Sequence, residues 1–436
     1  MSTYLLCATP VHGHVAPTVA VAGALSARGH AVTVLTGSRF RDAVQAVGAV
    51  HRPLDGLADY DDRDLGAFLP DRDAHRGVDR FQYDLQGIFI RPVPDQARAV
   101  ARLVDELRPD AILAEAGFAG VLPLLLGDPV ARPPVLALGV IPLSRSSVDV
   151  APYGLGLRPT RGALGRLRNR TLNALFQRVL FRRTQRLAVD VLASIGSAPL
   201  TDFVLDTSRR FDRFLQLSPA EFEYARSDLG DDVRFAGAVL PVLPDADPLP
   251  PWWDELDGSR PVVHVSQGTV DHLDFGRLVR PTLDALAGRD VLVVVATGGR
   301  PVHELGELPP NARAAEFLPY DRLFPRTDVF VTNAGFGGVQ FALSHGVPMV
   351  AAGDTEDKPE VSMRVQVCGA GLALRSGAPR PRTIRRAVDR VLSDAVFRER
   401  AAELASRVAG YDTFGIIEEE LEAAVAARRG SPRLAA

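Results

Sequence analysis

Two histidines flank one glycine near the start of the chain, in the stretch PVHGHVAP (10–17). Neutral imidazole is the side chain best suited to take up a proton near neutral pH, so His14 is a candidate general base. A metal site would need a third ligand, but no HExxH or CxxC motif is present and the next histidines are isolated: His30, His51 and His75. The pattern favours a base over a metal ligand at His14, and a plain turn residue at His12.

A glycine-rich turn, NAGFGG (333–338), follows the apolar run DVFVT and leads into a helix expected from about Val339. Glycines let the backbone approach a ligand. The free N–H groups and positive dipole end of the helix favour an anion such as a diphosphate. A nicotinamide-type Rossmann site would place this loop after the first strand, with an acid about 20 residues further on. The present loop comes late in the chain and lacks that layout.

Three further short stretches carry polar or aromatic groups that suit a nucleotide sugar. VSQGT (265–269) is a second glycine turn after a strand, and EFLPY (316–320) holds a ring and a proline able to flank a flat base. GDTEDK (353–358) presents several acids and the only lysine of the chain, Lys358. Sugar hydroxyls both donate and accept hydrogen bonds, so such mixed polar groups suit them.

Short apolar runs alternate with helical patterns along the chain, which predicts the α/β class, with parallel sheets covered on both faces. In the first half we expect strands at 3–9, 31–37, 111–115 and 134–139, and helices at about 17–28 and 39–48. In the second half we expect strands at 261–266, 291–297, 328–333 and 347–353. Between the halves, the proline-rich stretch 241–253 interrupts the alternation.

This organisation predicts two Rossmann-like, doubly wound domains that face each other across a cleft. We place the first at 1–238, a linker at 239–258, and the second at 259–436, with the last helix packing back on the first domain. Open parallel sheets bind ligands beyond the carboxyl ends of their strands, so the cleft is the expected site.

Composition limits the classes of function. The chain has 436 residues, is 46% hydrophobic, and carries a formal net charge of −3, which gives no electrostatic reason to expect nucleic acid as a partner. Its two cysteines, Cys7 and Cys368, lie far apart, which argues against a disulfide framework and fits a reducing cytoplasm. No apolar run approaches the roughly 20 residues of a membrane span.

Taken in order, these motifs resemble those of family 1 glycosyltransferases with the GT-B fold, in particular bacterial enzymes that glycosylate macrolides and other natural products. The resemblance extends over nearly the full length, from PVHGH through VSQGT, EFLPY and NAGFGG to TEDK. It implies a nucleotide-sugar donor in the second domain, a small-molecule aglycone acceptor in the first, and no cofactor or metal.

The resemblance also implies roles for single residues. His14 matches the catalytic base, His12 lies on the acceptor side, and Glu115, which ends RPDAILAE (108–115), matches the acid that supports the base. The donor-side residues fall into three groups. Phosphate-binding and diphosphate-loop positions are Gln267, Gly268, Thr269, Asn333, Gly335, Gly337, Gly338 and Val339; base-stacking positions are Phe317, Leu318 and Pro319; sugar-binding positions are Glu356, Asp357 and Lys358.

Three positions depart from the family pattern. Asn333 stands in place of a histidine that touches the diphosphate, and an amide donates a hydrogen bond without a charge. Phe341 replaces a glutamate that grips the ribose hydroxyls, which favours a deoxyribose and therefore a dTDP-sugar over a UDP-sugar. Lys358 replaces the usual glutamine; its compact ammonium suits a sugar hydroxyl or a phosphate, although survival of one lysine codon by chance explains it as well.

The reaction that follows from this resemblance is a single displacement with inversion, in which His14 takes the acceptor proton and the nucleotide diphosphate leaves. The loops 53–80 and 141–160 are expected to shape the acceptor pocket, and the acidic run DYDD (59–62) is expected to be solvated surface. Two alternatives remain open: a non-catalytic auxiliary relative that has lost its donor site, and a GT-B enzyme that acts on the nucleotide sugar itself, such as an epimerase.

The segment from Arg158 to Leu187 contains nine arginines and no acid, with apolar residues at roughly helical spacing. One interpretation is a basic amphipathic helix on an anionic membrane surface. The other, which the sequence favours, is a helix whose apolar stripe belongs to the core and whose basic face is solvated, so that membrane contact is not expected.

Overall fold

The computed structural model describes residues 1–240, 249–268 and 274–430. The first domain contains a sheet of seven parallel strands: β1 (Thr3–Cys7), β2 (Ala31–Thr36), β3 (Val50–Pro53), β4 (Ala111–Glu115), β5 (Val135–Gly139), β6 (Arg213–Gln216) and β7 (Val233–Phe235). Their order is β3-β2-β1-β4-β5-β6-β7, so the direction of winding reverses between β1 and β4. Ligands bind at such a reversal.

The second domain repeats this plan with six parallel strands: β8 (Val262–Ser266), β9 (Leu292–Ala296), β10 (Ala312–Ala315), β11 (Val329–Thr332), β12 (Met349–Ala351) and β13 (Gly371–Ala373). Their order, β10-β9-β8-β11-β12-β13, reverses between β8 and β11. The predicted α/β class with two doubly wound domains is therefore confirmed. The sequence pattern missed the strands that are short or partly exposed, such as β3 and β7.

Helices connect the strands in both domains. Those of the first domain are α1 (His12–Ala27), α2 (Arg41–Ala46), α3 (Leu65–Phe68), α4 (Gly77–Asp84), α5 (Val93–Leu107), α6 (Leu122–Leu126), α7 (Gly162–Leu175) and α8 (Arg182–Ser194). Those that follow are α9 (Val279–Leu286), α10 (Tyr320–Leu323), α11 (Phe336–Ser344), α12 (Lys358–Val367), α13 (Pro381–Ser393), α14 (Ala395–Val408) and α15 (Thr413–Gly430). None of the described helices is long and apolar enough to cross a membrane.

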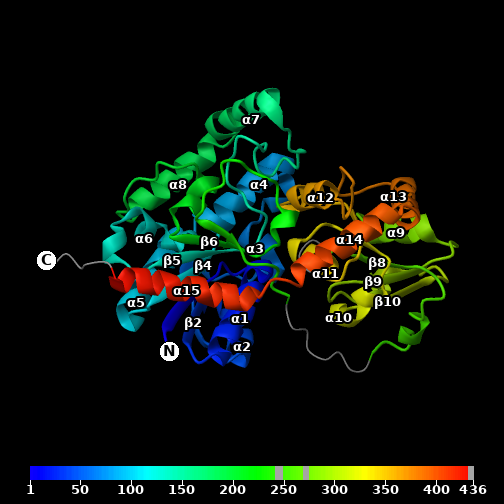
Figure 1. The fold of residues 1–436 in the computed structure, drawn as a ribbon, viewed down its shortest axis with the longest axis horizontal. Coiled ribbons are helices and arrows are strands. Elements are labelled where there is room, and N and C mark those ends of the chain that lie inside the picture. The colour runs from blue at the N-terminus through cyan, green and yellow to red at the C-terminus, as the bar shows by residue number, and fades with distance from the viewer. Residues whose placement is uncertain (241–248, 269–273, 431–436) are drawn as a thin grey trace.

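The chain returns to the first domain at its end. Figure 1 shows α14 on the second domain and α15 lying along the first. Ile417, Leu421 and Val425 of α15 are buried in the same apolar cluster as Leu6 of β1 and Val21 of α1. This packing ties the two domains together at a second point besides the predicted linker 239–258, of which 241–248 lie outside the described residues.

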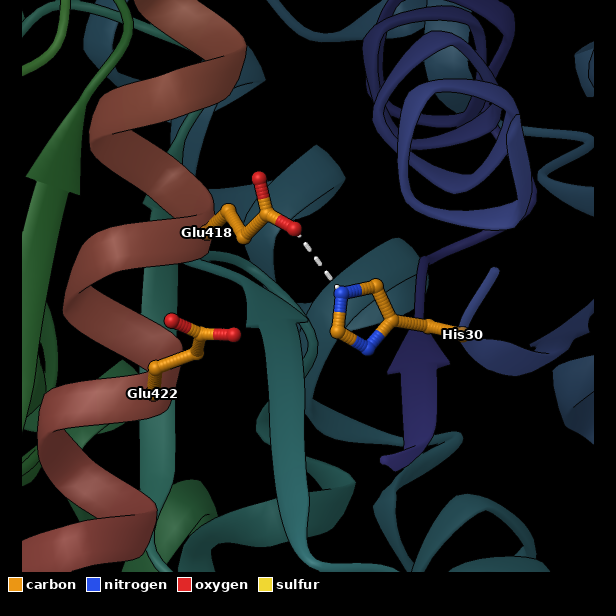
Figure 2. A group of neighbouring side chains, drawn as sticks. All are labelled: His30, Glu418 and Glu422. Carbon is orange, nitrogen blue, oxygen red and sulfur yellow. Dashed lines mark hydrogen bonds and ion pairs between the residues drawn. The ribbon is translucent and has the colours of Figure 1, made fainter. Parts of the chain in front are cut away.

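A hydrogen bond between His30 and Glu418 helps to hold α15 in this position (Figure 2). His30 Nε2 lies 2.9 Å from Glu418 Oε1, and Glu422 lies one turn further along α15. The spacing resembles a three-ligand metal site, but the Ser2 N–H donates to His30 Nδ1, which leaves the ring proton on Nε2 and directed at Glu418. A hydrogen bond between His30, which precedes β2, and Glu418 of α15 therefore explains why these side chains lie together.

The first helix begins earlier than predicted. It starts at His12 rather than near Pro17, so His14 lies in its first turn and Pro17 lies inside it. The cause is a contact that sequence does not show: the carboxylate of Asp62 accepts the His12 N–H at 2.6 Å and so satisfies one free donor of the helix end. The prediction that the run 59–62 is solvated surface is wrong for Tyr60 and Asp62, which are buried.

The outward face of α7 also contradicts the prediction. Gly165 and Asn169 are the buried residues of this helix, whereas Leu164, Leu167 and Leu175 are exposed. Most of the predicted apolar stripe therefore does not serve the core, although Phe176 at its end is buried and Leu172 is half-buried.

Candidate active site

A cavity of about 740 Å³ lies between the domains, at the carboxyl ends of both sets of strands. His14 and Gly117 contribute to its wall from the first domain, and Gly337 and Asp357 from the second. Both loops expected to shape an acceptor pocket reach it, through Leu65 and Arg72, and through Ile141 and Tyr153. Helices α4 and α8 and the segment 85–93 complete the apolar wall, and sequence reasoning had not included them.

The adjacency of β1 and β4 brings together two residues that are 101 positions apart. His14 follows β1, Glu115 ends β4, and His14 Nδ1 lies 2.8 Å from Glu115 Oε2. Glu115 is fully buried and also accepts the N–H groups of Thr9 (3.2 Å) and Gly117 (2.7 Å). Because an ionised carboxylate only accepts, Nδ1 carries the ring proton and the free lone pair is on Nε2.

Burial and charge act in opposite directions on both pKa values. Burial lowers the pKa of His14, but the charge and hydrogen bond of Glu115, with weaker contributions from Asp357 and Glu356, outweigh burial and raise it. Burial raises the pKa of Glu115, but His14 and the backbone donors outweigh burial and lower it. The pair therefore favours imidazolium beside carboxylate.

The glycine loop after β11 leads directly into α11, which begins at the cavity wall. Gly335 precedes the helix, and a Cβ placed on Gly337 would meet no atom within 4 Å, so the backbone here is open to the cavity. Ala334 has a φ of 64°, in the left-handed region that non-glycine residues rarely adopt. Such a strained backbone conformation persists only where the surrounding structure holds it, and positions of this kind are typical of functional sites.

Asn333 holds this loop rather than projecting from it. Its Nδ2 donates to the Gln267 carbonyl, and its Oδ1 accepts the Gly335 N–H at 3.3 Å. The side chain of Gln267 is engaged as well, since Oε1 accepts the N–H groups of Leu278 and Val279 at the start of α9. Both residues line the cavity, yet the Asn333 amide joins the turns after β8 and β11, and the Gln267 amide joins the turn after β8 to the start of α9. Thr269 lies outside the described residues.

The predicted base-stacking residues separate into two groups. Phe317 lines the cavity and is 67% exposed, so its ring is available to a planar group. Leu318 lines the cavity but is buried in the core beneath it, and Pro319 precedes α10 without reaching the cavity lining.

Val339 does not reach the cavity either. It is fully buried in the core, and its N–H donates to the Gly335 carbonyl at 3.1 Å. The prediction that Val339 contacts a ligand is wrong, because α11 begins three residues earlier than expected and uses this N–H internally.

The acidic turn before α12 faces the first domain across the cavity. Lys358 Nζ lies 2.8 Å from Glu356 Oε2, and Arg72 Nη2 of the first domain lies 3.1 Å from Glu356 Oε1. Burial would raise the pKa of Glu356, but these two cations lower it to about 2. Burial and the neighbouring Glu356 raise the pKa of Asp357 to about 6. Glu356 has a φ of 55°, a second strained position at this site.

Sequence reasoning missed Gln340. It lies one turn after Gly337 on α11, so both residues share the face that lines the cavity. The side chain is buried, and among the described residues neither its Oε1 nor its Nε2 has a hydrogen-bond partner. Buried amides are nearly always paired, so this one is available to a ligand. The sequence signal that could have indicated Gln340 is a polar residue between the apolar residues Val339 and Phe341 of α11.

Phe341, by contrast, packs into the core. It is buried against Tyr320 and Phe324, at ring-centroid distances of 5.8 and 6.3 Å, and only part of it reaches the cavity lining. Phe341 therefore offers no polar group to a ligand in the cavity.

Comparison with known proteins agrees with this architecture. Residues 280–422 match the family described as erythromycin biosynthesis protein CIII-like, C-terminal domain. The chain is 40% identical over 422 residues to 4'-demethylrebeccamycin synthase of Lentzea aerocolonigenes, and the aligned region covers 95% of this chain and 98% of that protein. It is 35% identical over 438 residues to UDP-glycosyltransferase 2 of Phaeomoniella chlamydospora, covering 97% and 96%.

A solved structure, that of the glycotransferase of kitacinnamycin, shares the fold with a TM-score of 0.71 at 21% identity, covering 99% of both chains. Two facing doubly wound domains of this kind define the GT-B fold. The chain belongs to the natural-product glycosyltransferases of this fold, the family that its motifs resemble.

Proposed function

We propose that this glycosyltransferase moves a sugar, with inversion, from a nucleotide diphosphate to a hydroxyl of an apolar natural-product aglycone, with His14 as the general base. The observation that carries the proposal is the 2.8 Å contact between His14 and the buried Glu115, in a cavity whose opposite wall is a glycine loop at a helix start. Imidazole oriented by a carboxylate is an efficient proton acceptor.

In this mechanism His14 Nε2 takes the acceptor proton while the acceptor oxygen attacks the anomeric carbon. The bond from that carbon to the diphosphate oxygen breaks, and the nucleotide diphosphate leaves with the electron pair. Glu115 stabilises the imidazolium, in keeping with the raised pKa of His14. The N–H groups at the start of α11 face the departing charge, and Lys358 adds a cation, so we propose that no metal ion is needed.

The acceptor side of the cavity supports an aglycone of low polarity. Its wall has few polar groups to orient a ligand. Aromatic and aliphatic side chains dominate it, among them Phe81, Leu85, Ile88, Phe89, Phe118 and Leu192. Burying a flat apolar ring system against such a wall stabilises the complex by about 25 cal/mol per Å². His12, which is exposed at the turn beside His14, belongs to the mouth of this acceptor side.

For the donor we propose a dTDP-sugar in preference to a UDP-sugar. The observation in favour is the apolar Phe341, which offers no acceptor to a ribose diol and leaves Gln340 as the polar contact on this face. The relative from Phaeomoniella chlamydospora, named a UDP-glycosyltransferase, points the other way.

Titration calorimetry with UDP and dTDP, without metal and then with magnesium, tests the donor side. The proposal expects metal-free binding that is tighter for dTDP. Tighter binding of UDP would overturn the nucleotide preference alone, and binding of neither would favour a non-catalytic auxiliary relative. Full turnover by the His14→Ala variant would instead favour chemistry on the nucleotide sugar itself, because an epimerase needs no acceptor base.

A further inference from the structure

Helix α7 turns its polar side inward and its apolar side outward. Asn169, which is fully buried, donates from Nδ2 to the Val148 carbonyl at 3.1 Å, and Asn173 donates to the Val150 carbonyl at 3.2 Å. A surface helix normally buries its apolar face, so this reversed orientation requires another explanation. Figure 1 shows α7 standing out at the top of the first domain.

The outward face continues beyond α7 into the π-helical turn Phe176–Leu180. Along it lie five apolar side chains that are between 45% and 85% exposed: Leu164, Leu167, Leu175, Val179 and Leu180. Leu164, Leu167 and Leu175 are three and eight residues apart, which places them on one side of the helix. Contiguous exposed apolar residues of this kind mark surfaces that bind a partner.

Arginines surround these residues. The stretch from Arg158 to Leu187 carries nine arginines and no acid, in a chain whose formal net charge is −3. Arg166 pairs with Asp149 from outside the stretch, whereas Arg170 and Arg178 are exposed and have no recorded ion pair among the described residues. A surface that combines leucines with unneutralised guanidinium groups is complementary to a partner that is both apolar and anionic.

We propose that the α7 face, defined as Leu164, Leu167, Leu175, Val179 and Leu180 with the arginines around them, docks on the surface of an anionic lipid bilayer. Size favours a bilayer over a protein partner: a face that runs from Leu164 to Leu180 offers a strip of roughly 25 by 10 Å, far below the roughly 800 Å² that each partner buries in a stable protein interface. A bilayer needs only a few inserted apolar side chains and several cations.

Docking in this way would bring the lipid phase near the proposed acceptor cavity. The same helical segment continues into α8, whose Ala188, Val191 and Leu192 line that cavity. This consequence, though not the docking itself, rests on the proposed function: an aglycone of low polarity partitions into lipid and would be collected there.

Co-sedimentation of the full chain with vesicles tests the proposal. Vesicles of phosphatidylglycerol and phosphatidylcholine in equal parts should bind at least tenfold more protein than pure phosphatidylcholine, and binding should weaken as salt is raised. The triple variant Leu164→Gln, Leu167→Gln, Leu175→Gln should lose at least tenfold in binding. Its matched control replaces three exposed apolar residues elsewhere: Leu57→Gln, Val130→Gln, Val396→Gln.

Nucleotide binding, measured in all variants, shows that they are folded and keeps this test separate from the proposed reaction. Equal binding of the triple variant and its control to anionic vesicles would overturn the proposal, and so would failure of the unaltered chain to bind them. A dimer of the unaltered chain that the triple variant abolishes would overturn it too, in favour of a second copy as the occupant of the α7 face.

Discussion

Arg72 of the first domain donates to Glu356 of the second at 3.1 Å, across 284 positions of sequence, at the edge of the proposed donor-sugar site. The same guanidinium donates to Asp84 at 2.8 Å, and the same carboxylate accepts from Lys358 at 2.8 Å. One chain of charges therefore joins the acceptor wall to the acidic turn before α12, and it pairs the Glu356 carboxylate with two cations.

Replacing Arg72 tests this link. In Arg72→Gln the charge of Glu356 is left with one cation instead of two, and the domains lose a contact beside the donor. We expect the KM for the nucleotide sugar to rise by about tenfold, as for a lost hydrogen bond between charged groups, with a smaller change in kcat. Steady-state kinetics measures this. Arg52→Gln, which removes an exposed pair with Glu106, is the control and should change neither constant.

Removing the base should affect chemistry rather than binding. We expect His14→Ala to lower turnover by about 10²–10⁴-fold while the affinity for nucleotide, measured by calorimetry, changes little. His12→Ala provides the matched control, because His12 lies in the same turn with an exposed side chain, and should retain turnover within a few-fold. Equal loss in both variants would remove His14 from its proposed role.

The carboxylate beneath the base should control its titration. The pKa of His14 is raised from 6.5 because Glu115 outweighs burial, so activity that needs neutral imidazole falls as the pH drops through this raised value. In Glu115→Gln the imidazolium loses its counter-charge, and the acid limb of the kcat profile should move to lower pH while the plateau falls by about 10²–10⁴-fold. A pH–rate profile whose acid limb stays in place contradicts this.

The glycine loop offers a substitution that should spare the fold. A Cβ at Gly337 would meet no protein atom within 4 Å, whereas one at Gly338 would already lie 3.6 Å from the Phe330 ring. We therefore expect Gly337→Val to keep the thermal midpoint near that of the unaltered chain while weakening nucleotide binding at least tenfold, because the side chain occupies the space where a diphosphate must approach. Unchanged nucleotide affinity would mean that the diphosphate binds elsewhere.

Gln340 should recognise the nucleoside. Gln340→Leu keeps nearly the same size and removes two unpaired buried polar atoms, so the fold should be as stable or more stable. Nucleotide affinity should fall by about tenfold, as for one or two lost hydrogen bonds, while the affinity for pyrophosphate stays the same. Calorimetry with UDP, dTDP and pyrophosphate separates the cases: an equal loss for pyrophosphate would place Gln340 at the diphosphate instead.

The amino-acid sequence by itself determined the class of the fold, because strand and helix periodicity is local and each apolar run needs only its own neighbours to be recognised. The same holds for the motifs around His14 and Gly337, since glycine and histidine carry their chemistry in their residue type. The family and its reaction class followed from the order of these motifs.

The tertiary structure decided what depends on long-range contacts. The start of α1 required Asp62, the raised pKa of His14 required Glu115 at 2.8 Å, and the second cation beside the Glu356 carboxylate required Arg72 from the other domain. Helix α7 shows the same limit most clearly. Its spacing of leucines indicates an amphipathic helix, but only the surrounding chain determines which face is turned inward, and here the asparagines find partners there and the leucines do not.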